Sequence, residues 1–301
     1  MDLTLRPMSI SEVLDRMFYL YKKNFVLFAG IAILPSALSL VVHLGTIAAG
    51  GGGIGVSKVM GANALLVTGF GRIVDLLVLS IGGTLASAAT AYALSMVHLG
   101  KGTSIGEAYS NVRPFIGRLM GVVISLSLMV AGIVVLIVIP FALAVTMPVL
   151  GIVIGVVGAI VGLVFIVHLY ARYALAIPAC VLEKVSAFQA LKRSSFLTKG
   201  RTGRVWLVFL LTGLINFALG FAIALPITVT GIAISHGRLT LGFSIATLVA
   251  QFIAGTLAGP IATISIGLLY YDERIRKEAF DLQYMMTAME QPGQQQAATA
   301  G

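Results

Sequence analysis

The sequence has few charged residues: they make up 10% of its 301 positions, against about 25% in an average soluble domain. Hydrophobic residues make up 58% of the chain, and the mean hydropathy is +1.03. A domain dissolved in water needs far more charged surface than this. The composition therefore excludes water as the main solvent and predicts an integral membrane protein.

Reactive side chains are also scarce, which excludes several kinds of site. Cys180 is the only cysteine, so neither a disulfide framework nor a cysteine-based metal centre is available. The chain has four histidines and eleven acidic residues, without a His-Glu-x-x-His pair, a nucleophile elbow or a histidine followed five positions later by an acid. We therefore expect a non-enzymatic protein with no catalytic residue, no metal site and no cofactor.

Long charge-free stretches are what the sequence has in place of these groups. They cover residues 24–57, 76–100, 119–171, 205–237 and 239–271. A spanning helix needs about 20 apolar residues, so the third stretch is long enough for two spans. The stretches do not alternate polar and apolar residues as barrel strands do, which indicates helices. The predicted spans are residues 25–48, 75–99, 119–145, 151–175, 205–235 and 241–271.

Basic residues gather on one side of these spans. Seventeen of the 20 Lys and Arg residues lie in segments 1–24, 100–118, 172–204 and 272–301, and the others are Lys58, Arg72 and Arg238. The positive-inside rule therefore predicts a multi-pass protein of the cell (cytoplasmic) membrane with both termini in the cytoplasm. The same topology explains the net charge of +9, so we expect no nucleic-acid partner.

Three similar segments precede the predicted hairpins. Each begins with a capping-box pattern, Ser9 to Glu12, Ser104 to Glu107 and Ser186 to Gln189, followed by apolar residues at helical spacing. The predicted fold is an all-α membrane protein of six transmembrane helices. They form three parallel repeats, at about 8–100, 103–184 and 185–282, each an amphipathic interfacial helix followed by a helical hairpin. These repeats make one domain, 1–290, and residues 291–301 are predicted to be a disordered tail.

The connections and helix faces carry two further signals. Segment 49–74 contains Gly50, Gly52 and Gly55 at the spacing of a dinucleotide fingerprint, but no strand precedes them, so we predict a flexible external loop. Small residues four apart recur on the second, fourth and sixth spans and predict close-packing faces that line a central contact or an interface between copies. They are Gly83, Ser87 and Ala91; Gly151 and Gly155; Gly158 and Gly162; Gly255 and Gly259.

Two groups of polar residues are candidates for function. The segment after the fourth span is the most basic, and we expect its side chains to contact anionic lipid head groups, unless they serve positive-inside topology alone. These residues are Lys184, Lys192, Arg193, Lys199, Arg201 and Arg204. The second group is a candidate intramembrane polar site that consists of Asp75, Arg72 one turn earlier and His168 in the fourth span. The alternative for Asp75 and Arg72 is an interfacial ion pair.

Three stretches of the sequence resemble a known family. They are residues 6–25, which begin R-P-M-S-I-S-E-V-L-D-R, residues 182–200, with A-L-K-R-S and L-T-K-G, and residues 268–281, L-L-Y-Y-D-E-R-I-R-K-E-A-F-D. They resemble the membrane-domain family of glycerophosphoryl diester phosphodiesterase. The resemblance implies a six-span module, and its name implies that some relatives carry a soluble phosphodiesterase domain. The histidines and metal-binding carboxylates of such a domain have no counterpart here.

The leading functional hypothesis is a lipid-contacting scaffold or accessory module without enzymatic activity. Its expected partners are membrane lipids and other membrane or cytoplasmic proteins, and the sequence leaves its oligomeric state open. The alternative is a transporter or permease for a small or lipid-like solute, which would use a central cavity with Asp75, His168 or proline kinks.

Overall fold

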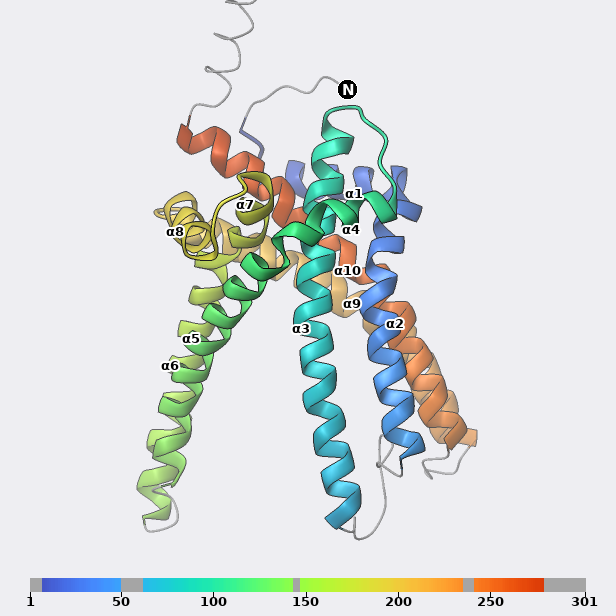
Figure 1. Ribbon diagram of the computed structural model, residues 1–301. Helices are drawn as coiled ribbons and strands as arrows, with labels where there is room; N and C mark the ends of the chain where they lie inside the picture. Colours follow the sequence, from blue (N-terminus) through green and yellow to red (C-terminus); the bar gives the residue numbers. More distant parts are fainter. Residues whose placement is uncertain (1–6, 50–61, 143–146, 235–240, 279–301) are drawn as a thin grey trace, which may run out of the picture.

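The structure is a computed structural model that describes residues 7–49, 62–142, 147–234 and 241–278. Throughout these ranges the regular secondary structure is helical (Figure 1). The described helices are α1 (Ile10–Lys23), α2 (Phe25–Ala48), α3 (Ala62–His98), α4 (Ile105–Val112), the 3-10 turn η1 (Arg113–Phe115), α5 (Ile116–Ala142), α6 (Pro148–Tyr173), α7 (Ala176–Leu182), α8 (Ala187–Thr198), α9 (Thr202–Ile234) and α10 (Leu241–Glu278).

Six of the described helices are long and apolar enough to cross a membrane, namely α2, α3, α5, α6, α9 and α10. This confirms the prediction of an all-helical, multi-pass membrane protein. The predicted span 25–48 coincides with α2, and the predicted starts of α5, α6 and α9 lie a few residues inside the observed ones. Helix α10 continues past its predicted end at residue 271 to Glu278, which carries its last turns into a charged sequence.

The prediction of a loop over residues 49–74 was wrong for its second half. Helix α3 begins at Ala62, so residues 62–74 are helical, while Gly50, Gly52 and Gly55 lie outside the described residues. Gly69 and Gly71 look like loop residues in the sequence, but a membrane helix uses glycine for close approach. A Cβ atom at Gly71 would overlap the side chain of Thr46 on α2.

Serine caps begin α1, α4 and α8 as predicted. Ser9 and Ser186 are extended residues whose side chains accept the backbone N–H of Glu12 and Gln189, and both form complete capping boxes. At Ser9 the return bond runs from its backbone N–H to Glu12 Oε2 at 2.6 Å. Ser104 makes the forward bond to the Glu107 N–H, whereas the Glu107 carboxylate accepts from the Thr103 hydroxyl instead. These caps satisfy N–H groups that the first helical turn leaves unpaired.

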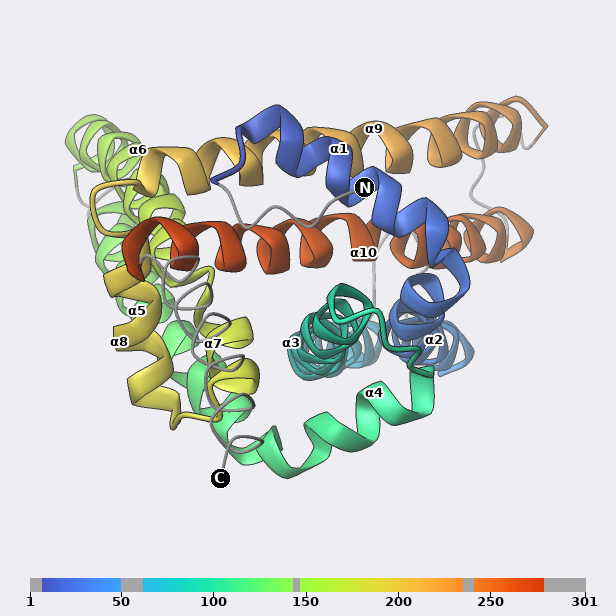
Figure 2. The ribbon, with the colours of Figure 1, turned by 90° about the horizontal axis from the view of Figure 1, so that it is seen from above.

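Short and long helices are segregated in space. Helices α1, α4, α7 and α8 lie at one end of the molecule, and the long helices run from there toward the opposite end (Figure 1). We call the end with the short helices the basic end. Seen along the long helices, α1 crosses α10, which it contacts, while α4 and η1 form the opposite edge (Figure 2). The 3-10 turn η1 joins α4 directly to α5.

The long helices divide into two unequal groups. Helices α2, α3, α9 and α10 pack together, and α10 contacts both α2 and α9 along much of its length. Helices α5 and α6 pack mainly on each other and diverge from α3 with distance from the basic end (Figure 1). In the most hydrophobic part of the span that contains α5, only 6% of the residues are buried, against 44% in that of α10. Lipid can solvate such an apolar surface, whereas water cannot.

The packed core lies at the basic end, where the short helices cover the long ones. Met17 of α1, Phe28 of α2, Leu94 of α3 and Ile264 of α10 are each fully buried in one apolar cluster. A second cluster joins α7, α8, α9 and α10 around Leu197 and Tyr270, which are also fully buried. The core therefore fixes the short helices against the bundle and positions the polar groups described below.

Small residues pack closely on α3 and α10 but do not bring α6 into the centre. On α3 the row from Ala86 to Leu94 is largely buried, and on α10 Gly255 and Gly259 approach α2. Gly162 of α6 instead faces Ile137 of its own hairpin partner α5. The expectation that the fourth span lines a central contact was therefore wrong, because the α5–α6 pair stands apart.

Candidate functional site

A cluster of buried ion pairs joins α9, α10 and the chain before α1 at the basic end. We call it the ion-pair cluster; it consists of Arg201, Arg204, Asp272, Glu273 and Arg276, together with the backbone of Met8. Asp272 and Glu273 are both 0% exposed. Carboxylates are almost never fully buried without partners, so these two require the surrounding guanidinium groups.

Asp272 is fully engaged in this cluster. Its Oδ2 atom lies 2.7 Å from Arg204 Nη2 and 2.9 Å from Arg276 Nε, and its Oδ1 atom accepts the Met8 N–H at 2.6 Å. The Met8 carbonyl accepts from both arginines, at 2.6 Å each. The carboxylate and the two arginines thus hold Met8, which lies just before the Ser9 cap, against α10.

Glu273 is less well satisfied. Its Oε2 atom lies 3.5 Å from Arg201 Nη1 and its Oε1 atom lies 3.8 Å from Arg204 Nε, distances at which charges attract but no hydrogen bond forms. Both carboxylate oxygens and the two facing nitrogens are buried without a hydrogen-bond partner. The stability of the Glu273 charge therefore depends on two nearby positive charges rather than on direct hydrogen bonds.

A second ionic group connects α8 to α10. Arg193 Nε donates to Glu183 Oε1 at 2.8 Å and its Nη2 contacts Glu278. The Tyr270 hydroxyl donates to the same Glu183 oxygen at 2.6 Å. Burial lowers the pKa of Arg193, but the hydrogen bonds and charges of Glu183 and Glu278 outweigh burial and raise it overall. This group ties the basic segment to the end of α10.

The six residues predicted to contact lipid head groups divide into two sets. Arg193, Arg201 and Arg204 take part in the ion pairs just described, although the Arg201 side chain stays 39% exposed. Lys184, Lys192 and Lys199 are exposed, and no ion pair joins their side chains to the described part of the chain. The acids that pair with Arg201 and Arg204 come from α10, about 70 residues later, so the sequence around residues 184–204 gave no sign of them.

Sequence reasoning missed the ion-pair cluster, although a signal was present. The sequence D-E-R-I-R-K-E, residues 272–278, directly follows an apolar span. Charges that follow a span usually lie in water, so this sequence by itself does not indicate burial. In the structure α10 continues through it as a helix, which turns Asp272 and Glu273 toward α9.

Exposed aromatic residues accompany lysines on two helices of the basic end. On α8, Phe188, Lys192 and Phe196 are spaced four apart and are all exposed. On α1, exposed Tyr19 lies four residues before Lys23, whose Nζ is 5.8 Å from the ring centroid. Residues four apart share one face of a helix. Both helices thus present aromatic rings and positive charges away from the core, on faces we call the aromatic–lysine faces.

The structure does not bring together the three residues of the predicted intramembrane site. Asp75 is buried at 7% exposure, whereas Arg72 on α3 and His168 on α6 are exposed. Among the described residues, the groups near Asp75 come from α2: Ser39 Oγ donates to its Oδ1 at 2.5 Å, and His43 Nδ1 lies 3.6 Å away. The interpretation of Asp75 and Arg72 as an ion pair was therefore wrong, because α2 supplies the neighbours.

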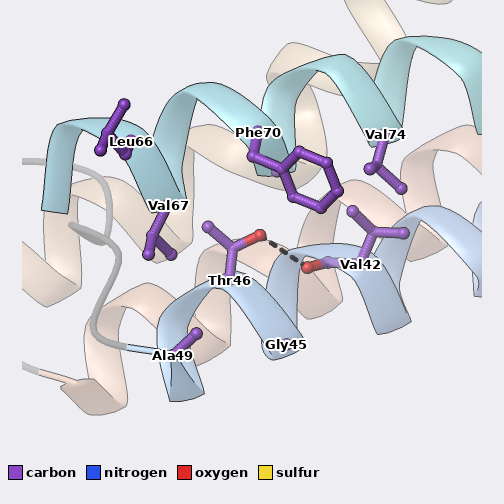
Figure 3. A pocket seen from close by; sticks show the side chains of 9 residues that line it. Val42, Gly45, Thr46, Ala49, Leu66, Val67, Phe70 and Val74 are labelled. Carbon is purple, nitrogen blue, oxygen red and sulfur yellow. Dashed lines mark hydrogen bonds between the residues drawn. The ribbon is translucent and has the colours of Figure 1, made fainter. Parts of the chain in front are cut away.

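Two cavities lie along α2. An apolar one of about 520 Å³ between the far halves of α2 and α3 is lined by Val42, Thr46, Phe70 and Val74, among others (Figure 3). The Thr46 hydroxyl donates a hydrogen bond to the Val42 carbonyl oxygen, so its polar group is satisfied within the helix. A smaller cavity of about 100 Å³ between α2 and α10 is lined by polar Ser36, Ser39, His43 and Gln251 as well as apolar residues.

No group of three or more His, Cys, Asp or Glu residues that could hold a metal ion occurs among the described residues. Cys180 is buried, and its Sγ lies 3.6 Å from the Val185 carbonyl oxygen. What these sites offer chemically is charge: ammonium groups exposed at the basic end, and a buried carboxyl group beside an imidazole at Asp75 and His43.

Comparison with known proteins finds one family. Residues 148–292 match the family described as the membrane domain of glycerophosphoryl diester phosphodiesterase. The match confirms the resemblance seen in residues 182–200 and 268–281. It runs from α6 through α10 and includes every side chain of the ion-pair cluster, while Asp75 lies outside it. No curated protein and no solved structure matches the chain.

Proposed function

Because residues 148–292 belong to the membrane-domain family of glycerophosphoryl diester phosphodiesterase, we propose that the chain is a lipid-contacting accessory module without a catalytic centre of its own. The chain is a multi-pass membrane protein with six apolar helices. The proposed role is to bind anionic lipid at the basic end and to present that surface to membrane or cytoplasmic partners.

The aromatic–lysine faces of α1 and α8 are the observation that carries this proposal. Aromatic rings prefer the level of the lipid head groups, and lysines there attract anionic lipids. On α8 this arrangement is Phe188, Lys192 and Phe196, with the opposite face of the helix buried through Ala190 and Leu191. A helix of this kind rests on the membrane surface with its lysine among the phosphates.

Among the six basic residues, we assign stability to the arginines that form ion pairs and lipid binding to the exposed lysines. Arg193 pairs with Glu183 and with Glu278 of α10, and Arg201 and Arg204 pair with Glu273 and Asp272, so these arginines are paired within the protein. Lys184, Lys192 and Lys199 keep their charges exposed to the surroundings. The lipid contact predicted from the sequence is therefore proposed for these three lysines, with the positive-inside rule placing them on the cytoplasmic face.

The test compares lipid binding by a triple variant, Lys184→Gln, Lys192→Gln and Lys199→Gln, with binding by the wild type. Each lysine near an anionic leaflet contributes about 1 kcal/mol, so the variant should bind fluorescent phosphatidylglycerol up to roughly a hundredfold more weakly. The matched control replaces the same lysines with arginine, which keeps the charge, and should bind like the wild type. Phosphatidylcholine binding should not change in either variant.

Unchanged phosphatidylglycerol binding by the glutamine variant would reject the proposal. The rival function, transport of a small or lipid-like solute, predicts a different result. Flux of that solute into proteoliposomes would then depend on Asp75 and disappear in Asp75→Asn, while the three lysines would have no effect on it.

A further inference from the structure

A buried carboxylate on α3 faces a serine and a histidine of α2 in the half of the bundle away from the basic end. Ser39 Oγ donates to Asp75 Oδ1 at 2.5 Å, and His43 Nδ1 lies 3.6 Å from the same oxygen. Ser39 and His43 are one helical turn apart, so they share a face of α2. The Asp75 residue itself is 7% exposed.

Among the described residues, His43 is the only ionisable group that another helix brings to this carboxylate. Helix α2 carries no other ionisable residue, and α10 carries none along residues 241–269. Helices α4, α5 and α7 contact α3 nearer the basic end (Figure 1). Arg72, on α3 itself, is exposed and forms no ion pair with Asp75 within the described structure. A carboxylate in apolar surroundings is costly, so its charge requires His43.

The hydrogen-bond geometry fixes where His43 exchanges a proton. Its Nδ1 atom lies 2.8 Å from the Ser39 carbonyl oxygen and faces the Asp75 carboxylate as well. Both of these groups accept hydrogen bonds, so Nδ1 carries a hydrogen whether the ring is neutral or charged. The exchangeable proton is therefore the one on Nε2.

A cavity beside the histidine gives this proton a path. The cavity of about 100 Å³ is lined by Ser36, Ser39, His43 and Gln251. This volume is enough to hold water, and the hydroxyl, imidazole and amide groups of the lining can serve as its hydrogen-bond partners. Water in the cavity can accept the Nε2 proton and pass it on.

We propose that Asp75 and His43 form a binding site for one exchangeable proton. In the loaded state a His43 imidazolium faces the Asp75 carboxylate, and the pair has no net charge. In the unloaded state the Nε2 proton has moved to a cavity water, and a single negative charge remains between α2 and α3. This site is independent of the lipid-binding surface proposed above, which lies at the opposite end of the bundle.

Nitrogen NMR on ¹⁵N-histidine protein in phosphatidylcholine nanodiscs tests the proposal directly. The chain has only four histidines, and His43→Gln identifies the His43 signals. At about pH 7.5, above the ordinary titration range of histidine, the wild type should show His43 protonated at both nitrogens. Exposed His168 gives a reference signal in the same sample and serves as the internal control. A neutral His43 at that pH would overturn the proposal, and this comparison requires no variant of Asp75.

Stability provides a second readout. Under the proposal the folded protein holds one proton that the unfolded chain releases, so its stability should fall as pH rises, by up to tenfold in the unfolding equilibrium per pH unit. Asp75→Asn removes the stranded charge and should abolish this slope, while Asp15→Asn, at an exposed acid of α1, should keep it. An unchanged slope in Asp75→Asn would overturn the proposal. A slope that disappears in sodium chloride but not in choline chloride would also overturn it, in favour of a sodium site.

Discussion

Replacing Arg204 by glutamine should be among the most damaging single changes to this protein, because it removes a charge from the ion-pair cluster. The variant loses the 2.7 Å contact of Arg204 with Asp272, its hydrogen bond to the Met8 carbonyl and the positive charge 3.8 Å from Glu273. These acids are fully buried. Breaking a buried ion pair typically costs about 3 to 5 kcal/mol, because the remaining charge cannot reach water.

The expected cost lies near the lower end of this range. Asp272 keeps Arg276 at 2.9 Å and the Met8 N–H at 2.6 Å, and the Met8 carbonyl keeps its bond from Arg276. Glu273 keeps only Arg201, at 3.5 Å and partly exposed. Most of the loss therefore arises at Glu273, and we expect the free energy of unfolding to fall by about 3 kcal/mol, roughly a hundredfold in the unfolding equilibrium.

The assay is unfolding of the purified protein in mixed micelles by increasing dodecyl sulfate. Arg113→Gln, at an exposed arginine of η1, is the matched control and should change stability by no more than about 0.5 kcal/mol. Adding Glu273→Gln to Arg204→Gln removes the stranded carboxylate and should recover most of the loss. If Arg204→Gln cost no more than Arg113→Gln, or if Glu273→Gln gave no recovery, the account of buried charge would be refuted.

Two further changes test the packing and capping of α8. Gly121→Ala on α5 places a Cβ atom 2.8 Å from the rigid Cβ of Ala187, so it should lower the free energy of unfolding by about 1 to 3 kcal/mol. Gly117→Ala, one turn earlier in open space, is the control and should not lower it. Equal stability of the two variants would contradict the contact. Ser186→Ala removes the capping box and should cost about 1 kcal/mol in the same assay, while Ser186→Asp, which can still cap, should cost less. Equal losses from the alanine and aspartate variants would argue against the cap.

Most of the helical plan was predictable because it depends on local properties of the chain. Span 25–48 coincides with α2 because an uninterrupted apolar stretch must form its hydrogen bonds within itself when lipid surrounds it. The serine caps at Ser9 and Ser186 involve residues only three apart, so the sequence shows both partners at once. The start of α3 was misjudged because glycine breaks helices in water but supports close packing in a membrane.

The candidate sites could not be predicted in the same way, because their partners are distant in the chain. Arg204 and Asp272 are 68 positions apart, and each looks like an ordinary flanking charge in its own segment. Asp75 had an apparent partner in Arg72, one turn away, yet the packing of α2 on α3 surrounds it with Ser39 and His43 instead.

The sequence by itself thus determined the solvent of this protein, the number of its spans and the beginnings of the three serine-capped helices, since hydropathy and caps act over a few residues. Only the tertiary structure decided which charges are buried together and which lysines stay exposed. Burying a charge is favourable only beside an opposite charge, and which charges meet depends on how helices far apart in the chain pack against one another.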